Sequence, residues 1–188
     1  MRTIRHFAVL VAALALAVAP VAATGAAGVV KSRTTPSVGT QLAELEGSNF
    51  FGFSVAMSGK TVIVGAPGNT AYGAPGAAYV FTKTSTGWNQ VAELQGSDLD
   101  MFGYSVAISG TTAMVGAPGY AKNAGRVYVF TKTAAGWMQV AELKGSDTVA
   151  NDSFGWSVAI SGTTAIVGAM SGHSVQGRAY VFTKTSTG

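Results

Sequence analysis

The sequence predicts an all-β fold built from repeated four-stranded blades, and three observations lead to this prediction. A Phe-Gly pair recurs at residues 51, 102 and 154, and a Gly-Ala pair recurs at residues 65, 116 and 168. A period of about fifty residues is typical of a repeat architecture. The segment after each Phe-Gly pair alternates bulky and small side chains with a period of two, as a strand does. Charged residues make up only 11% of the chain and glycine is abundant, which suits close-packed strands joined by short turns.

The first strand of each repeat is predicted to begin at the Phe-Gly pair, at residues 51–58, 102–109 and 154–161. Phenylalanine, other aromatic residues and aliphatic residues alternate there with Gly, Ser and Ala. The small face carries no charge and no long polar side chain, so it is not a solvent face. We therefore expect each sheet to stack on its neighbour, bulky face into small face.

Three more strands complete each predicted repeat. The second strands, at 61–65, 112–116 and 164–168, follow a Ser-Gly pair that predicts a tight hairpin, and they are apolar on both faces like central strands. The third strands are predicted at 77–83, 126–132 and 178–184. The more polar fourth strands, at 88–94 and 137–143, suit an outer edge that faces water. Four antiparallel strands stacked around an axis form a β-propeller blade, whereas a β-sandwich would not require one strand pattern three times.

Blades are predicted at about residues 48–94, 97–143 and 146–188. Residues 41–47 repeat the fourth-strand pattern, so an extra outer strand precedes the first blade, while the third blade lacks its own. A closed propeller usually has about 4–8 blades, so three are too few. Two arrangements remain open: a partial propeller cut from a longer protein, or a homodimer with a six-bladed ring in which each Gln41–Leu45 strand completes the other chain's third blade.

The first forty residues are predicted to lie outside the repeats. Arg2 and Arg5 precede an apolar run at 7–19, which Pro20 ends, and small residues follow. This layout predicts a signal peptide over residues 1–23, and hence a secreted protein, extracellular or periplasmic. The alternative is an uncleaved anchor, but a spanning helix needs about 20 apolar residues. After cleavage we expect no membrane insertion, and residues 24–40 are predicted to form a flexible linker.

These motifs resemble the FG-GAP repeat, the blade unit of the integrin α-chain propeller and of many bacterial secreted proteins. The resemblance covers about residues 41–188. It rests on the Phe-Gly pairs at 51, 102 and 154 and on the Gly-Ala-Pro triplets that begin at 65 and 116. In the third copy, Met170 replaces the proline of the triplet. It implies a β-propeller, commonly seven-bladed in that family, that binds ligands or partners outside the cell.

The resemblance also implies a calcium site that the loop sequences do not support. Integrin-type blades often hold Ca²⁺ in an Asp-x-Asp-x-Asp-Gly loop after Gly-Ala-Pro, whereas the loops at 68–73, 119–125 and 171–177 contain no carboxylate. Ca²⁺ requires about 6–8 oxygen ligands, so we expect no metal and no cofactor. The remaining metal candidates precede the second and third Phe-Gly pairs, where aspartate is also a routine turn residue. They are Asp98, Asp100, Asp147 and Asp152.

Neither catalysis nor nucleic-acid binding is predicted. Beyond the predicted signal peptide the only histidine is His173, and general-base catalysis needs a positioned partner for such a group. The glutamates Glu44, Glu93 and Glu142 occupy equivalent outer-strand positions, which indicates a structural role. The chain has no catalytic motif and no basic stripe that would serve a phosphate backbone.

The binding candidates are positions that vary inside the constant frame. Phe53, Tyr104 and Trp156 each follow a Phe-Gly pair and would form an aromatic rim, or alternatively pack between blades. The unequal loops before each Phe-Gly pair are the other candidates, because binding residues concentrate on loops of a rigid scaffold. We expect a secreted, non-catalytic binding or adhesion module for an extracellular protein or polysaccharide. The alternative is the truncated propeller portion of a larger secreted enzyme or cell-surface protein.

Overall fold

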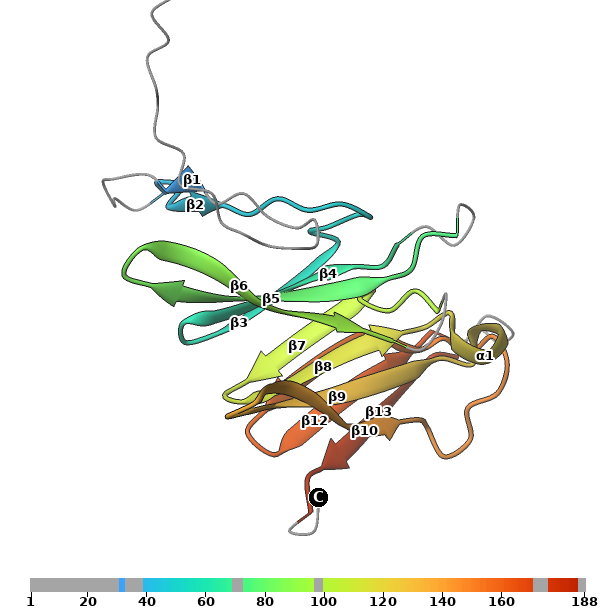
Figure 1. The fold of residues 1–188 in the computed structure, drawn as a ribbon. Helices are drawn as coiled ribbons and strands as arrows, with labels where there is room; N and C mark the ends of the chain where they lie inside the picture. Colours follow the sequence, from blue (N-terminus) through green and yellow to red (C-terminus); the bar gives the residue numbers. More distant parts are fainter. Residues whose placement is uncertain (1–30, 33–38, 69–72, 97–99, 171–175, 186–188) are drawn as a thin grey trace, which may run out of the picture.

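The computed structural model describes residues 31–32, 39–68, 73–96, 100–170 and 176–185. Within these residues, three antiparallel sheets stack face to face, and a short two-stranded sheet lies beside the first of them (Figure 1). The predicted signal peptide lies outside the described residues. Among the residues described, no helix is long and apolar enough to cross a membrane.

Each large sheet corresponds to one predicted blade, with its strands in sequence order. Blade 1 contains β3 (Ser54–Ser58), β4 (Thr61–Ala66), β5 (Ala77–Thr84) and β6 (Gly87–Gln95). Blade 2 contains β7 (Ser105–Ser109), β8 (Thr112–Ala117), β9 (Arg126–Thr133) and β10 (Gly136–Leu143). Blade 3 contains β11 (Phe154–Ser161), β12 (Thr164–Ala169) and β13 (Arg178–Thr183). The all-β prediction of four antiparallel strands per complete blade is confirmed.

The predicted start of the first strand is wrong in two of the three blades. β3 begins at Ser54 and β7 at Ser105, so the Phe-Gly pairs of blades 1 and 2 precede the strands. The glycine of each pair has a positive φ, +92° at Gly52, +92° at Gly103 and +89° at Gly155, which only glycine adopts without strain. In blade 3, β11 does begin at Phe154, but its register with β12 shifts between Phe154 and Ser157.

This turn directs the phenylalanine into the core. In blade 2 the ring of Phe102 is fully buried, with its centroid 5.3 Å from that of Tyr128 and 6.0 Å from that of Phe130. The same triad recurs in the other blades at nearly the same distances. Edge-to-face aromatic pairs at such spacings contribute about 0.5–1.5 kcal/mol beyond the area they bury. The Phe-Gly pair therefore fixes the core of its own blade.

The blades pack as predicted, small face against bulky face, and we call this contact the blade seam. Between blades 1 and 2, the hydroxyl of Ser54 donates to the carbonyl of Gly103 at 2.9 Å, and the amide of Gly110 donates to the Ser58 hydroxyl at 3.0 Å. Val106 of blade 2 is buried in the cluster that also contains Ile63 and Val80 of blade 1. Small residues in the first strand thus allow close approach and supply polar contacts.

The seam between blades 2 and 3 repeats this arrangement. The Ser105 hydroxyl donates to the Gly155 carbonyl at 2.7 Å, and the amide of Gly162 donates to the Ser109 hydroxyl at 3.1 Å. A side chain at Gly116 would overlap the Gly155 carbonyl, as one at Gly65 would overlap the Gly103 carbonyl. The Gly of the Gly-Ala pair in blades 1 and 2 is therefore explained by the backbone of the following blade.

The N-terminal outer strand is shorter than predicted and has a partner that was not predicted. β2 (Ala43–Glu44) pairs with β1 (Lys31–Ser32), which lies within the segment predicted as a linker. Leu45, like Phe51, packs against the hydrophobic cluster of blade 1. Leu94 belongs to the cluster that contains Phe102, and Leu143 packs against the one that contains Phe154. The segment thus occupies the position of an outer strand belonging to a blade before blade 1.

Candidate binding surface

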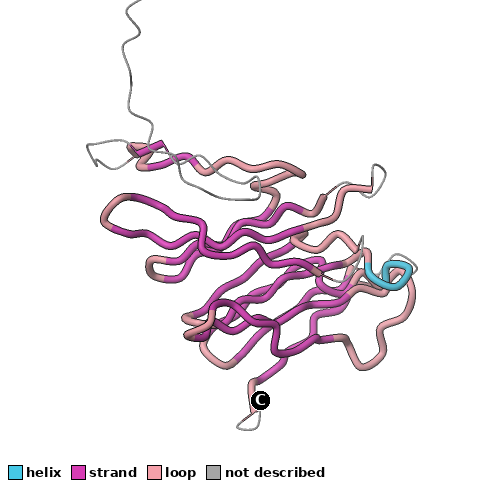
Figure 2. The backbone as a smooth tube through the Cα atoms, in the orientation of Figure 1, coloured by secondary structure: helices cyan, strands magenta, loops and turns pink. Residues whose placement is uncertain are grey.

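The two ends of the stacked sheets differ in character. Tight turns join paired strands at one end, including Ser58 to Thr61, Ser109 to Thr112 and Ser161 to Thr164. The longer connections, from β4 to β5 and from β8 to β9, and those between blades, lie at the other end (Figure 2). The first strands also begin at that end, so the residues after each Phe-Gly pair and the long loops share one surface.

The structure brings Phe53, Tyr104 and Trp156 together at this loop end, and we call them the aromatic row. The ring centroids of Phe53 and Tyr104 lie 4.7 Å apart and those of Tyr104 and Trp156 lie 4.6 Å apart, with interplanar angles of 48° in both pairs. Phe53 is 53% exposed, and the other two side chains are half-buried. The sequence predicts either an exposed aromatic rim or packing between blades. In the structure the rings contact one another across the seams and also remain accessible.

Identical backbone turns position the three rings. The amides of Phe53, Tyr104 and Trp156 each donate to the carbonyl three residues earlier, at 3.1 Å. Each turn contains a residue of positive φ just before the Phe-Gly pair, namely Phe50, Met101 and Ser153. Burial of the ring raises the pKa of the Tyr104 hydroxyl.

An open hollow of about 410 Å³ adjoins the Trp156 end of the row. Met170, Gly177 and Arg178 contribute to its lining. Arg178 lies 3.7 Å from a carboxylate oxygen of Asp147 and 3.5 Å from one of Asp152. The hollow therefore combines an aromatic face, an exposed thioether and a cation held by two carboxylates.

A left-handed turn ties the long loop of blade 2 to blade 3. This turn is α1 (Tyr120–Asn123), inside which Ala121 and Lys122 have positive φ, so it is no regular helix. The carbonyls of Lys122 and Asn123 accept hydrogen bonds of 3.1 and 2.7 Å from the amides of Asn151 and Ser153. The guanidinium of Arg126 lies 3.8 Å from the centroid of the Tyr120 ring, within the range of a cation–π contact.

The structure describes three of the four aspartates considered as metal ligands, and of these Asp147 and Asp152 both lie near Arg178. Asp98 lies outside the described residues. Asp100 is buried and accepts from the Phe102 amide at 3.0 Å and the Tyr128 hydroxyl at 3.1 Å. Asp152 is also buried and accepts from the Val149 amide at 2.9 Å. Asp100 and Asp152 each accept a backbone amide of their own turn, and each also contacts a residue of the third strand of its blade, Tyr128 or Arg178.

Asp147 is exposed and accepts a 2.7 Å hydrogen bond from the Tyr180 hydroxyl. This bond, with the nearby charge of Arg178, lowers the pKa of the Asp147 carboxyl. Among the residues that the structure describes, no three His, Asp or Glu side chains group as metal ligands would. His173 falls outside those residues.

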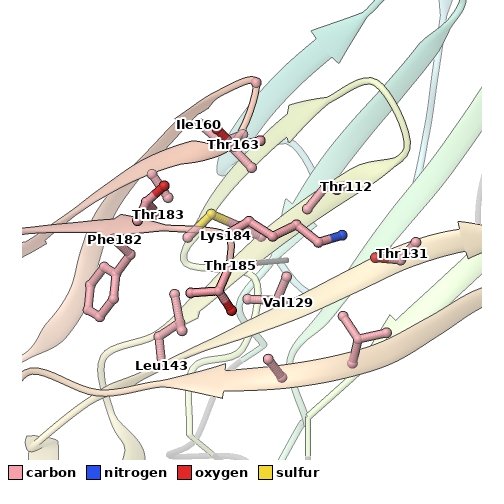
Figure 3. A pocket seen from close by; sticks show the side chains of 15 residues that line it. Thr112, Val129, Thr131, Leu143, Ile160, Thr163, Phe182, Thr183, Lys184 and Thr185 are labelled. Carbon is pink, nitrogen blue, oxygen red and sulfur yellow. The ribbon is translucent and has the colours of Figure 1, made fainter. Parts of the chain in front are cut away.

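A cavity that sequence reasoning missed lies between blades 2 and 3, with a volume of about 500 Å³. Met114, Val129 and Leu143 line it from blade 2, and Ile160 and Phe182 line it from blade 3 (Figure 3). The equivalent place between blades 1 and 2 contains Trp137, from the outer strand of blade 2. Blade 3 has no outer strand among the described residues, and the cavity is the space that such a strand would cover.

Comparison with known families identifies the repeat. The model of the FG-GAP repeat matches residues 44–81, 88–130 and 137–182, one match per blade. A search of curated proteins finds no match to the chain. The three family matches cover more than half of the chain. Each begins in an outer strand (β2, β6 or β10) and ends in the third strand of the following blade (β5, β9 or β13). The chain belongs to the FG-GAP repeat family.

Proposed function

We propose that this chain is a secreted, non-catalytic binding module of adhesion type, and that the aromatic row contacts its partner. The observation that carries the proposal is the contact between three aromatic rings from three blades, half-accessible at the loop end. Aromatic side chains supply large, rigid contact area and are enriched where proteins bind partners. The partner is an extracellular protein or polysaccharide, in keeping with the leader-like residues 1–23.

The surrounding surface supports binding better than catalysis. The three rings of the aromatic row remain partly exposed, so a partner can stack on them. The described aspartates accept hydrogen bonds from backbone amides or tyrosines and are not paired for acid–base work. Release of sugars from any polysaccharide that the chain binds would contradict a non-catalytic role.

The test compares row variants with a matched surface control. Trp156→Ala and Tyr104→Ala chains are run beside the wild type in native gels containing soluble polysaccharides, and over immobilised extracellular proteins. We expect at least about fivefold weaker binding for each row variant, since truncating an aromatic hot-spot residue costs more than about 1 kcal/mol. Met138→Ala removes an exposed apolar side chain from β10 and should bind like wild type. Binding that both row variants leave unchanged would refute the role of the row.

A second candidate function is supported by the open faces of blades 1 and 3. Val55 on β3 and Val181 on β13 are strongly exposed, as expected of blades that normally have neighbours. In that case the chain works as the propeller portion of a larger secreted enzyme or cell-surface protein. Its own contribution would still be partner contacts. If the repeats and a catalytic domain are found in one polypeptide, that finding would favour this second function over the function of an independent binding module.

A further inference from the structure

Each blade seam uses the same small set of contacts. The side nearer the N-terminus supplies two serine hydroxyls and two glycines: in blade 2 they are Ser105, Ser109, Gly116 and Gly125. The following blade supplies a glycine carbonyl, a hairpin amide and the bulky residues of its first strand. A side chain at Gly125 would overlap the Phe154 carbonyl, so this glycine, like Gly116, is required by the next blade.

Blade 3 keeps the first half of this set, and no described strand is docked on it. Ser157, Ser161, Gly168 and Gly177 occupy the equivalent positions. Ser157 and Ser161 are exposed, whereas Ser105 is buried, and within the described residues neither of the two blade 3 hydroxyls has a hydrogen-bond partner. A side chain at Gly168 would meet only the rotatable hydroxyl of Ser157 in its own blade, and no carbonyl of a following one.

Blade 1 keeps the complementary half. Val55 and Met57 are 70% and 65% exposed, whereas Val106 and Ile108, their equivalents in blade 2, are each 7% exposed. The Gly52 carbonyl and the Gly59 amide correspond to the Gly103 and Gly110 groups that blade 1 binds. The two open ends of one chain thus match each other as blades 1 and 2 do.

The outer edges match as well. β13 has no outer neighbour among the described strands, and residues 41–45 have the sequence of an outer strand. In blade 2, Arg126 on β9 forms an ion pair with Glu142 on the outer strand. Arg178 is the equivalent of Arg126, and Glu44 on β2 is the equivalent of Glu142. A 41–45 strand placed along β13 would bring opposite charges together.

We propose that the open face of blade 3 binds the open face of blade 1 in a second copy of this chain, head to tail, and that two such contacts close a six-bladed ring. Each contact would place Gly52 and Gly59 of one copy on Ser157 and Ser161 of the other. Closed propellers usually have about 4–8 blades. Each copy contributes the three large sheets that the structure describes, so two copies would supply six blades, within that range. Contacts between unlike faces form rings when the rotation closes.

The test measures the mass of the purified chain by light scattering during size-exclusion chromatography. We expect a discrete species of twice the chain mass. Met57→Lys and Ala159→Lys each place a charge in one half of the seam, at a position that is exposed in the single chain, so both variants should fold. Each variant alone should be monomeric, because both contacts of its ring are damaged. An equimolar mixture should recover dimers through the one contact that joins two intact faces.

Two milder changes probe the contacts themselves. Ser157→Ala should raise the dissociation constant of the dimer by a few-fold to about tenfold per seam, as expected for loss of one hydrogen bond. Glu44→Arg should also weaken the dimer, because it would place a second cation instead of a carboxylate beside Arg178 of the other copy. Met138→Ala is the matched control, because Met138 lies on the outer strand of blade 2 and outside both open faces.

Three results would overturn the proposal. A folded wild-type monomer at about 100 μM would show that a second copy does not occupy these faces, since stable protein–protein interfaces normally bind more tightly than that. An open-ended series of oligomers would exclude the closed ring. Dimers that survive Ala159→Lys but not Met57→Lys would indicate pairing of two blade 1 faces, a different interface.

Discussion

Truncating Phe102 to alanine tests whether the Phe-Gly phenylalanine holds its blade together. The ring is fully buried and lies against Tyr128 and Phe130, at centroid distances of 5.3 and 6.0 Å. Replacing a buried phenylalanine by alanine costs about 3–5 kcal/mol, from lost transfer free energy and the cavity left behind. The two aromatic contacts favour the upper part of that range. Because folded domains are stable by only about 5–15 kcal/mol, the loss is a large part of the total.

The assay is thermal unfolding followed by near-ultraviolet and far-ultraviolet circular dichroism. For a chain of this size each kcal/mol shifts the melting temperature by about 2–4 °C, so Phe102→Ala should lower it by about 6–20 °C. Phe50→Ala is the matched control: the same truncation at an exposed phenylalanine, expected to change stability by at most about 0.5 kcal/mol. A Phe102→Ala chain that melts within 2 °C of the Phe50→Ala chain would refute the assignment of Phe102 to the core.

Two further perturbations test the seam and the surface of blade 3. Gly116→Ala should destabilise the chain by about 1–3 kcal/mol in urea unfolding, because the added methyl overlaps the Gly155 carbonyl; a gain in stability, as for a glycine in open space, would contradict the close approach. Asp147 has a pKa lowered by the Tyr180 hydroxyl, so its contribution to stability is complete above its ordinary value of 3.8 and is lost as the pH falls through the lowered pKa. Asp147→Asn should therefore lower the melting temperature at pH 7, and the two curves should converge in acid; an equal difference at every pH would exclude this carboxylate as the cause.

Much of the blade architecture could be predicted from the sequence because it is local and repeated. Period-two alternation in three copies indicated the first strands, and Ser-Gly pairs indicated the hairpins that the structure contains. The alternation predicts that the Phe-Gly pair belongs to the strand, because phenylalanine continues the pattern. In blades 1 and 2 the pair instead forms a turn before the strand, since its glycine has a positive φ. A hydrophobic pattern does not reveal backbone angles of that kind.

The candidate binding surface was only half visible in the sequence. Equivalent positions identified Phe53, Tyr104 and Trp156, but contact between rings about fifty residues apart depends on how the blades stack. The hollow beside Trp156 and the cavity between blades 2 and 3 have no sequence signal, since each is lined by residues from strands that meet only after folding. The hydrogen-bond donors to Asp100 and Asp152 could not be predicted either, because the backbone of the folded turns sets them.

The sequence by itself determined the fold class, the repeat and the membership of each strand in a blade, because strand periodicity and turn chemistry act over a few residues. The tertiary structure alone decided which groups meet between blades. Ser105 and Gly155 stand fifty residues apart, and their 2.7 Å hydrogen bond exists because small residues let two sheets approach closely. The same need for close approach explains why the open face of blade 3 carries the serines and glycines of a seam. The residues that complement them lie exposed on blade 1.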